Sequence, residues 1–217
     1  MNRRKSKRGQ ARLFIVGADE AGRGPLAGPV TGAAVILPPG YVNSGINDSK
    51  KLSAEQRCEL AAAIRRDALA WAVYSVGPRR IEHINILQAA RLAMARSVDR
   101  VHRIMGGRYR DVRLFVLVDG NVRLETKWPQ ETMVKGDGRM ASIGAASILA
   151  KVVRDELMAL ADVRYPQYGF RNHKGYATHA HRQALAEFGY CRLHRRSFAG
   201  VCLETGSAQG EEQAELF

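Results

Sequence analysis

Four carboxylic acids in this chain occur where a strand or a turn is expected to end, and together they could bind divalent cations. Asp19 and Glu20 end one apolar run, Asp119 ends a second, and Asp137 lies between two glycines. Carboxylates that lie close together raise one another's pKa values unless a cation lies between them. Mg²⁺ is a hard cation that carboxylates and phosphate oxygens bind. We therefore predict that these acids converge at one edge of a sheet and hold a metal.

The alternative for any single acid is an ordinary turn or cap residue. That alternative explains the first pair poorly, because Gly22, Arg23 and Gly24 follow it at once. Glycines let the backbone approach a ligand closely, and a guanidinium group binds phosphate through a planar fork of donors. The segment therefore favours a ligand that contains phosphate.

The net charge points toward a polyanionic partner. The 217 residues carry a formal charge of +13. The first twelve residues contribute +6 and the last fourteen −4, so the residues between them carry +11. Lysine and arginine gain free energy by displacing counterions from a phosphate backbone. Basic charge alone is weak evidence for a particular function, because ribosomal and membrane-surface proteins share it.

The cysteines and the hydropathy pattern bear on the compartment. Cys58, Cys191 and Cys202 are odd in number and have no Cys-x-x-Cys spacing, which argues against a disulfide framework and a thiolate zinc site. There is no apolar run of signal-peptide or membrane-spanning length. We expect a cytoplasmic protein that does not enter the membrane and is a monomer.

Strand-like and helix-like segments alternate along the chain, which predicts one mixed α/β domain with a central sheet and a helical C-terminal portion. Strands are expected at 13–18, 30–37, 71–76 and 114–118. Helices are expected at 53–70, 81–104, 141–160 and 181–188, the first of them opened by a capping box of Ser53 and Gln56. We expect the domain to span 12–203, between a basic disordered tail at 1–11 and an acidic one at 204–217.

Several motifs resemble those of bacterial ribonuclease HII, in the order and spacing of that family and over about residues 12–200. They are Asp19-Glu-Ala-Gly-Arg-Gly-Pro-Leu-Ala-Gly-Pro-Val30, Asn47-Asp-Ser-Lys-Lys-Leu-Ser53, Val118-Asp-Gly120, Lys135-Gly-Asp137, Ala145-Ala-Ser-Ile-Leu-Ala-Lys151 with Arg154-Asp155, and His173-Lys-Gly-Tyr176 with Thr178. The first of these motifs is highly specific.

The resemblance implies a ribonuclease H-like fold and an endonuclease that cuts the RNA-containing strand of RNA–DNA hybrids. It also implies cutting 5′ of ribonucleotides embedded in duplex DNA, leaving a 5′-phosphate and a 3′-hydroxyl. The implied metal ligands and catalytic residues are Asp19, Glu20, Asp119 and Asp137, which would hold two Mg²⁺ or Mn²⁺ ions.

The resemblance also implies which residues contact the substrate. The backbone of Gly22, Arg23 and Gly24 would contact the ribose 2′-hydroxyl, which distinguishes RNA from DNA. Tyr176 would pack against the deoxyribose on the DNA side of a junction. Such contacts suit ribonucleotide excision repair.

Other basic residues are candidate phosphate contacts. Lys50 and Lys51 follow an expected turn, and their alternative is two solvated lysines before a capped helix. Lys151 and Arg154 share one helix face, where they either meet phosphate or decorate an exposed helix; we favour the exposed helix. The basic segment 171–196, which includes Arg195, favours a nucleic-acid face over a helix with core aromatics.

Three nearby histidines suggest a metal cluster, but their spacing argues against it. His179 and His181 are two residues apart and would diverge on a helix, and no cysteine or acid completes a zinc shell with His173. We predict no zinc site there.

The last residues resemble the Gln-x-x-Leu-Phe peptides with which bacterial proteins bind the replication sliding clamp. Gln213, Leu216 and Phe217 match that pattern, whereas Ala214 stands where a leucine is usual. The alternative is a tail without a partner.

Two rival functions remain. A sister nuclease of the same fold that prefers long hybrids would fail to cut a duplex with a single ribonucleotide. A catalytically silent basic RNA-binding protein would leave Asp119 and Asp137 without a role.

Overall fold

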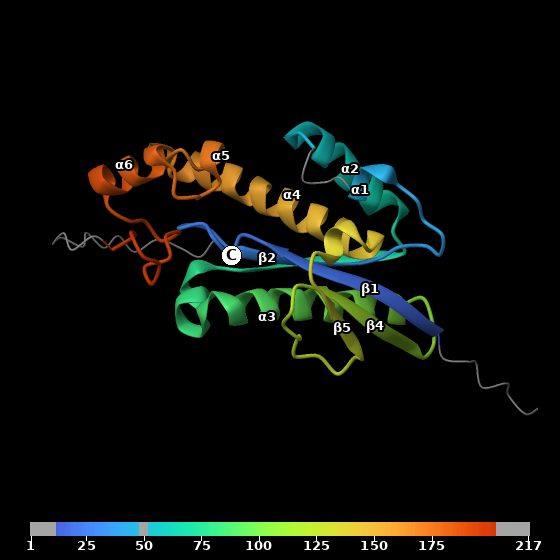
Figure 1. Cartoon of the computed structure of the whole chain (residues 1–217). Helices are drawn as coiled ribbons and strands as arrows, with labels where there is room; N and C mark the ends of the chain where they lie inside the picture. Colours follow the sequence, from blue (N-terminus) through green and yellow to red (C-terminus); the bar gives the residue numbers. More distant parts are fainter. Residues whose placement is uncertain (1–11, 48–51, 203–217) are drawn as a thin grey trace, which may run out of the picture.

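The computed structural model describes residues 12–47 and 52–202, which form a sheet with helices on both faces (Figure 1). The strands are β1 (Arg12–Ala21), β2 (Val30–Ile36), β3 (Ala70–Val76), β4 (Val112–Asp119) and β5 (Gln130–Met133). The helices are α1 (Ser44–Asn47), α2 (Ala54–Asp67), α3 (Pro78–Gly106), α4 (Ala141–Arg164), α5 (Phe170–His173) and α6 (His179–Phe188), with the 3₁₀ turns η2 (Gly136–Gly138) and η3 (Pro166–Tyr168).

Among the described residues the sheet has five strands in the order β3-β2-β1-β4-β5. The pairs β3–β2 and β2–β1 are antiparallel, whereas β1–β4 and β4–β5 are parallel. The carboxyl ends of β1 and β4 therefore lie side by side in the middle of the sheet. This edge is the one that the sequence predicts for the acids.

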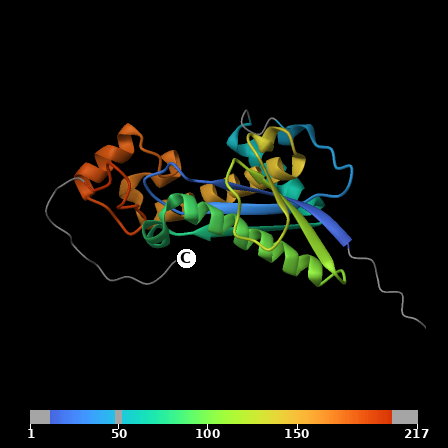
Figure 2. The same ribbon diagram turned by 60° about the horizontal axis from the view of Figure 1, so that its bottom comes forward.

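Each face of the sheet has its own apolar core. Val16 and Ala18 of β1 pack with Val98 of α3 on one face. Ala33 of β2 packs with Leu149 of α4 on the other face, which α2 also covers. Figures 1 and 2 show α3 alone along one face and α4 with α2 on the opposite face.

The predicted elements are present, and some of their bounds differ for physical reasons. The capping box of Ser53 and Gln56 opens α2 as expected. The helix α3 begins at Pro78 rather than Ile81, because proline suits the first position of a helix. It also has a kink at Asn85, whose φ is +63°.

The first strand is longer and less buried than its apolar sequence predicts. Leu13 and Ile15 are 65% and 52% exposed, because they share the face of Gly17, which meets α4 only at its first residues, Ser142 and Ile143. The short strand β5 was not predicted, since its sequence Gln-Glu-Thr-Met has little apolar character.

The C-terminal portion is helical, as predicted, and packs at the far end of α4 (Figure 2). Tyr168, Phe170 and Leu193 form its own apolar cluster with Met158 of α4 and Ala27. In the described ranges no helix combines the length and the apolar character that a membrane span requires.

Candidate active site

Asp19 and Asp119 lie next to each other at the carboxyl ends of β1 and β4. Their preceding residues, Ala18 and Val118, are partners in the parallel register. The Asp19 side chain is only 5% exposed, and its Oδ1 accepts a hydrogen bond of 2.7 Å from the Glu20 amide. Two acids from distant parts of the sequence therefore share one edge of the sheet.

Asp137 joins this edge through the turn that carries it. The amide of Gly136 donates a hydrogen bond of 2.7 Å to Asp119 Oδ1, and Asp137 is buried. A Cβ on Gly136 would lie 2.6 Å from Ile143 Cδ1 and 3.4 Å from Asp119 Oδ1. A side chain there would have to displace the end of the Ile143 side chain, so the turn packs closely between β4 and α4.

Glu20 lies at the same edge but on the other side of β1. The strand continues regularly through Ala21, so no bend separates the two adjacent acids. Gly32, the register partner of Glu20, packs against the backbone of α3, whereas Gly17, two residues before Asp19, packs against that of α4. The Glu20 carboxylate forms a 3.4 Å ion pair with Arg23.

The charges at this edge are poorly compensated. Burial, the neighbouring Glu20 and the Asp119 charge raise the pKa of Asp19 to about 8. Burial raises the pKa of Glu20 as well, and Arg23 opposes that shift. A hydrogen bond from Ser147 of α4 lowers the pKa of Asp19 but does not offset the desolvation. A cation at this edge would stabilise the ionised acids.

The arrangement fits hard cations that share their ligands with a substrate. Within residues 12–47 and 52–202, no three His, Cys, Asp or Glu side chains are gathered into a preformed metal site. Mg²⁺ usually binds through one or two carboxylates, water and substrate phosphates rather than in a cage of protein ligands. The oxygen-only donor set and the raised pKa values suit that mode of binding.

A glycine-rich loop, residues 22–29, follows β1 and borders the acids. Gly22 has a φ of +98°, which favours glycine. Arg23 and Gly24 are exposed, and a Cβ on Gly24 would lie 3.9 Å from Tyr176 Cε1. The structure therefore brings Tyr176, which is 44% exposed, to the loop with which the sequence associates it.

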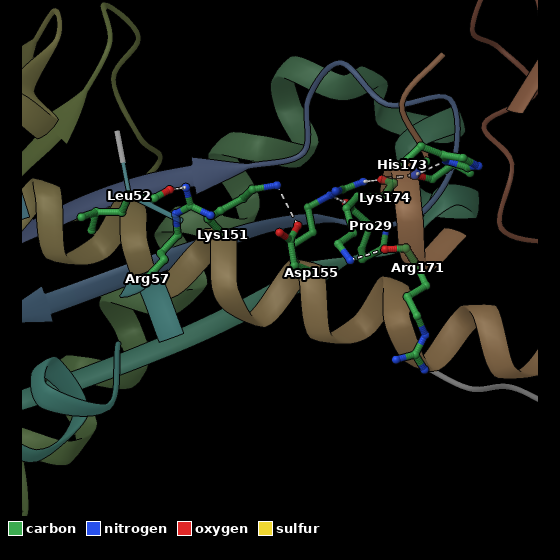
Figure 3. Close-up of polar contacts among 11 residues, drawn as sticks. Pro29, Leu52, Arg57, Lys151, Asp155, Arg171, His173 and Lys174 are labelled. Atoms are coloured by element: carbon green, nitrogen blue, oxygen red, sulfur yellow. Dashed lines mark hydrogen bonds and ion pairs between the residues drawn. The ribbon is translucent and has the colours of Figure 1, made fainter. Parts of the chain in front are cut away.

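Helix α4 contributes to the site more than the sequence predicts. Lys151 lies one turn after Ser147, pairs with Asp155 at 2.7 Å, and places its Nζ 5.8 Å from the Tyr176 ring centre. Figure 3 shows Lys151 and Asp155 pointing toward each other. The expectation that Lys151 and Arg154 decorate an exposed helix was wrong for Arg154, which is fully buried.

The prediction for Arg195 was also wrong. We expected it to lie on a nucleic-acid face formed by the basic segment 171–196. Its side chain is fully buried. The composition of the segment gives the sign of its charge but does not show the main-chain carbonyls that Arg154 and Arg195 meet. Neither hydropathy nor charge distinguishes these two arginines from their exposed neighbours, although Arg154 belongs to one of the quoted motifs.

The histidines of the C-terminal portion form a hydrogen-bonded chain. His181 Nε2 and His194 Nε2 are 3.0 Å apart. His194 Nδ1 accepts from the Cys191 amide, so its Nε2 carries the proton and donates to His181, whose Nδ1 donates to the Tyr176 carbonyl. His173 stacks on His181 with ring centres 4.4 Å apart. Two of the three histidines considered in the sequence therefore lie together.

Some predicted residues lie outside the described ranges. They are Lys50, Lys51, Gln213, Leu216 and Phe217.

The sequence matches the family description "Ribonuclease HII" over residues 16–201. Ribonuclease HII of Syntrophotalea carbinolica is 48% identical over 198 residues, which are 91% of this chain and 90% of that protein. Ribonuclease HII of Moorella thermoacetica is 50% identical over 197 residues, with 90% of each chain covered.

Solved structures of lower identity share the fold. Ribonuclease H2 of Pyrococcus horikoshii has a TM-score of 0.71 at 22% identity, covering 86% of this chain and 94% of that one. Ribonuclease HII of Archaeoglobus fulgidus, solved with PCNA, has a TM-score of 0.68 at 24% identity, covering 88% and 98%. Bst ribonuclease HIII, solved with Mn²⁺, has a TM-score of 0.71 at 19% identity, covering 88% and 68%.

The identities near 50% over nine-tenths of the chain establish its family, whereas the solved structures alone establish only its fold. The fold is the one that the motifs imply, with the sheet and flanking helices of the ribonuclease H2 and HIII structures. The chain belongs to the ribonuclease HII family and is a ribonuclease H endonuclease that acts on RNA–DNA hybrids.

Proposed function

We propose that this enzyme also cuts duplex DNA on the 5′ side of an embedded ribonucleotide, even a single one, and leaves a 5′-phosphate and a 3′-hydroxyl. The observation that carries the proposal is the position of Asp19 beside Asp119, at an edge bordered by the loop that meets Tyr176. The acids that would bind the catalytic cations thus lie next to the loop and the tyrosine that would contact the sugars.

Asp19, Glu20, Asp119 and Asp137 are the proposed ligands of two divalent cations, Mg²⁺ or Mn²⁺. Cations bound there would activate a water molecule and stabilise the leaving 3′-oxygen of the scissile phosphate. The protein's part is to hold the acids in place. The Gly136 amide fixes Asp119, and Ser147 with the Glu20 amide fixes Asp19.

The proposed substrate contacts follow from the loop beside the acids. The backbone of Gly22, Arg23 and Gly24 would contact the 2′-hydroxyl, since neither glycine has a side chain that intervenes. The exposed ring of Tyr176 offers a flat apolar surface to the next sugar. Lys50 and Lys51 remain proposed phosphate contacts.

A labelled duplex with one ribonucleotide, incubated with Mg²⁺, Mn²⁺ or chelator, tests the proposal. We expect cleavage only with a divalent cation, at the 5′ side of the ribonucleotide, and a ligatable 5′-phosphate. Cleavage in chelator would contradict the metal-dependent mechanism, and failure on this duplex with activity on a long hybrid would favour the sister nuclease.

An acid-to-amide pair provides the matched control. Asp119→Asn should lower kcat at least about 10³-fold, because it removes a proposed ligand. Asp111→Asn removes the same charge just before the opposite end of β4, where the φ of +53° suits asparagine, and should keep kcat within about twofold.

We propose further that the tail binds the sliding clamp and that the enzyme works in the cytoplasm, where its cleavage starts the excision of ribonucleotides. The support is the resemblance of Gln213, Leu216 and Phe217 to clamp-binding peptides. Deleting 213–217 should abolish binding to purified clamp without changing cleavage of a short duplex. Undiminished binding after the deletion would contradict this part.

A further inference from the structure

Two arginines are buried without a carboxylate. Arg154 and Arg195 are both 0% exposed, and within the described part of the chain neither forms an ion pair. Removing a guanidinium group from water is costly unless its donors are satisfied. Burial lowers the pKa of both groups. Such a cost indicates that these side chains hold something in place.

Arg195 holds the glycine-rich loop, residues 22–29. Its Nη2 donates to the Gly22 carbonyl at 2.6 Å, its Nη1 to those of Arg23 and Pro25 at 2.9 Å each, and its Nε to that of Gly28 at 3.0 Å. Its amide donates to the Leu26 carbonyl at 2.8 Å. One side chain therefore holds four carbonyls of the loop, including the two that come just before the amides of Arg23 and Gly24.

Arg154 joins the other end of this loop to the segment before Tyr176. Its Nε donates to the Pro29 carbonyl at 3.0 Å, and its Nη2 donates to those of Ala27 and Lys174 at 3.2 and 2.9 Å. Figure 3 shows Pro29 and Lys174 close together beside α4. The two arginines thus fix the loop relative to residues 174–176, called the Tyr176 segment below.

The loop's N–H groups divide into two sets. The amides of Leu26 and Gly28 donate to the carbonyls of Gly175 and Leu193. The amides of Arg23 and Gly24 donate to no acceptor among the described residues. Apart from the buried Ala27 amide, which also donates to no described acceptor, the donors that remain are in the segment proposed to contact the 2′-hydroxyl.

We infer that Arg195 is a positioning residue for ribose recognition, with Arg154 in a supporting part; this inference rests on the proposed function. The guanidinium group is not a substrate contact, since it is buried beneath the loop. By holding the loop carbonyls, the guanidinium group determines the direction in which the amides of Arg23 and Gly24 point. That direction determines the preference for a ribonucleotide over a deoxyribonucleotide. Lysine keeps the charge but lacks the planar fork that spans several carbonyls.

The test is the ratio of two affinities. Fluorescence anisotropy in Ca²⁺ buffer gives Kd for a duplex with one ribonucleotide and for the all-DNA duplex of the same sequence. Because a misdirected amide would leave the contact with the 2′-hydroxyl unmade, we expect Arg195→Lys to lower the preference about tenfold. Arg154→Lys should lower it in the same direction.

Arg100→Lys is the matched control. Arg100 Nη1 also donates to a main-chain carbonyl, that of Val73 at 2.7 Å, but it is exposed and belongs to α3. Its substitution should leave the ratio unchanged. Thermal unfolding of each variant confirms that the folded protein is measured, and Arg154→Lys provides the test if Arg195→Lys does not fold.

The outcomes separate this inference from the function on which it rests. A wild-type ratio of one contradicts the proposed function and removes this inference with it. A clear wild-type preference that both variants retain, or a loss of affinity that is equal for the two duplexes, overturns the inference alone and leaves Arg195 as a structural residue.

Discussion

Asp19 is buried in a place where its charge is unfavourable without a partner. Its pKa of about 8 lies far above the ordinary value of 3.8, mainly because burial disfavours the ionised form and because Glu20 and Asp119 repel it. The protein therefore gives up stability to keep this carboxylate at the site. A bound cation would remove this cost, because its positive charge would stabilise the ionised carboxylate.

In chelator, Asp19→Asn should stabilise the protein, and the gain should grow with pH. The folded state binds the Asp19 proton up to about pH 8, whereas the unfolded state releases it near pH 4. Wild-type stability therefore falls as pH rises through this window. Each kcal/mol of relief raises Tm by about 2–4 °C for a chain of this size.

Thermal unfolding at pH 5.5, 7.0 and 8.5 measures that gain against Asp111→Asn as the control. A difference between Asp19→Asn and wild type that stays constant over these pH values would contradict the assigned environment.

The elements that carry the site approach one another closely because two strands have glycine in the middle. A Cβ on Gly17 of β1 would lie 2.2 Å from the Ser142 carbonyl carbon, and one on Gly32 of β2 would lie 2.5 Å from the Met94 amide nitrogen. Helix α4 therefore rests directly on β1, beside Asp19. This contact brings Ser147 within reach of the buried acid.

Gly17→Ala should destabilise the fold by at least about 3 kcal/mol, because the methyl group would overlap backbone that cannot move aside. Gly106→Ala, at the end of α3, has nothing within 4 Å and should be nearly neutral. Urea unfolding of the two variants compares them. Equal midpoints would show that α4 is not packed as described.

The histidine chain connects α6 to the Tyr176 segment, and it should weaken in acid. Burial lowers the pKa of His194 to about 3 and lowers that of His181. The unfolded state takes up these protons near pH 6.5, so the stability that the pair contributes is present above that pH and is lost as pH falls toward 3.

His194→Asn keeps an acceptor for the Cys191 amide but removes the ring that meets His181. We expect this variant to lose less free energy of unfolding than wild type between pH 6.5 and pH 4. His179 is an exposed residue of α6, the helix that contains His181, and His179→Asn should keep the wild-type slope. Chemical denaturation across this pH range gives both slopes, and parallel curves for wild type and His194→Asn would rule out the proposed linkage.

At the scale of the whole molecule, the sequence predicts the elements better than their contacts. Apolar runs and the capping box locate most strands and helices, because local patterns determine them. The pairing of β1 with β4 depends on contacts between segments about a hundred residues apart, so the sequence predicted that the acids share a sheet edge but not which strands bring Asp19 and Asp119 together. The polar strand β5 and the buried Arg154 and Arg195 were missed, because neither hydropathy nor charge indicates the partners that stabilise them.

The charge of the whole molecule raises the local concentration of nucleic acid, but the acids at the sheet edge determine whether a cation completes the site. Binding of a cation by these acids can be measured without turnover. At pH 7 an Asp19 with a pKa of about 8 is mostly protonated, and a carboxylate must lose its proton to bind a metal.

The most direct test is a calorimetric titration of Mn²⁺ into the enzyme at pH 7, repeated in two buffers of different ionisation enthalpy. We predict binding with release of about one proton, and loss of that release at pH 9.5 and in Asp19→Asn. Absence of Mn²⁺ binding, or binding at pH 7 without proton release, would contradict the account.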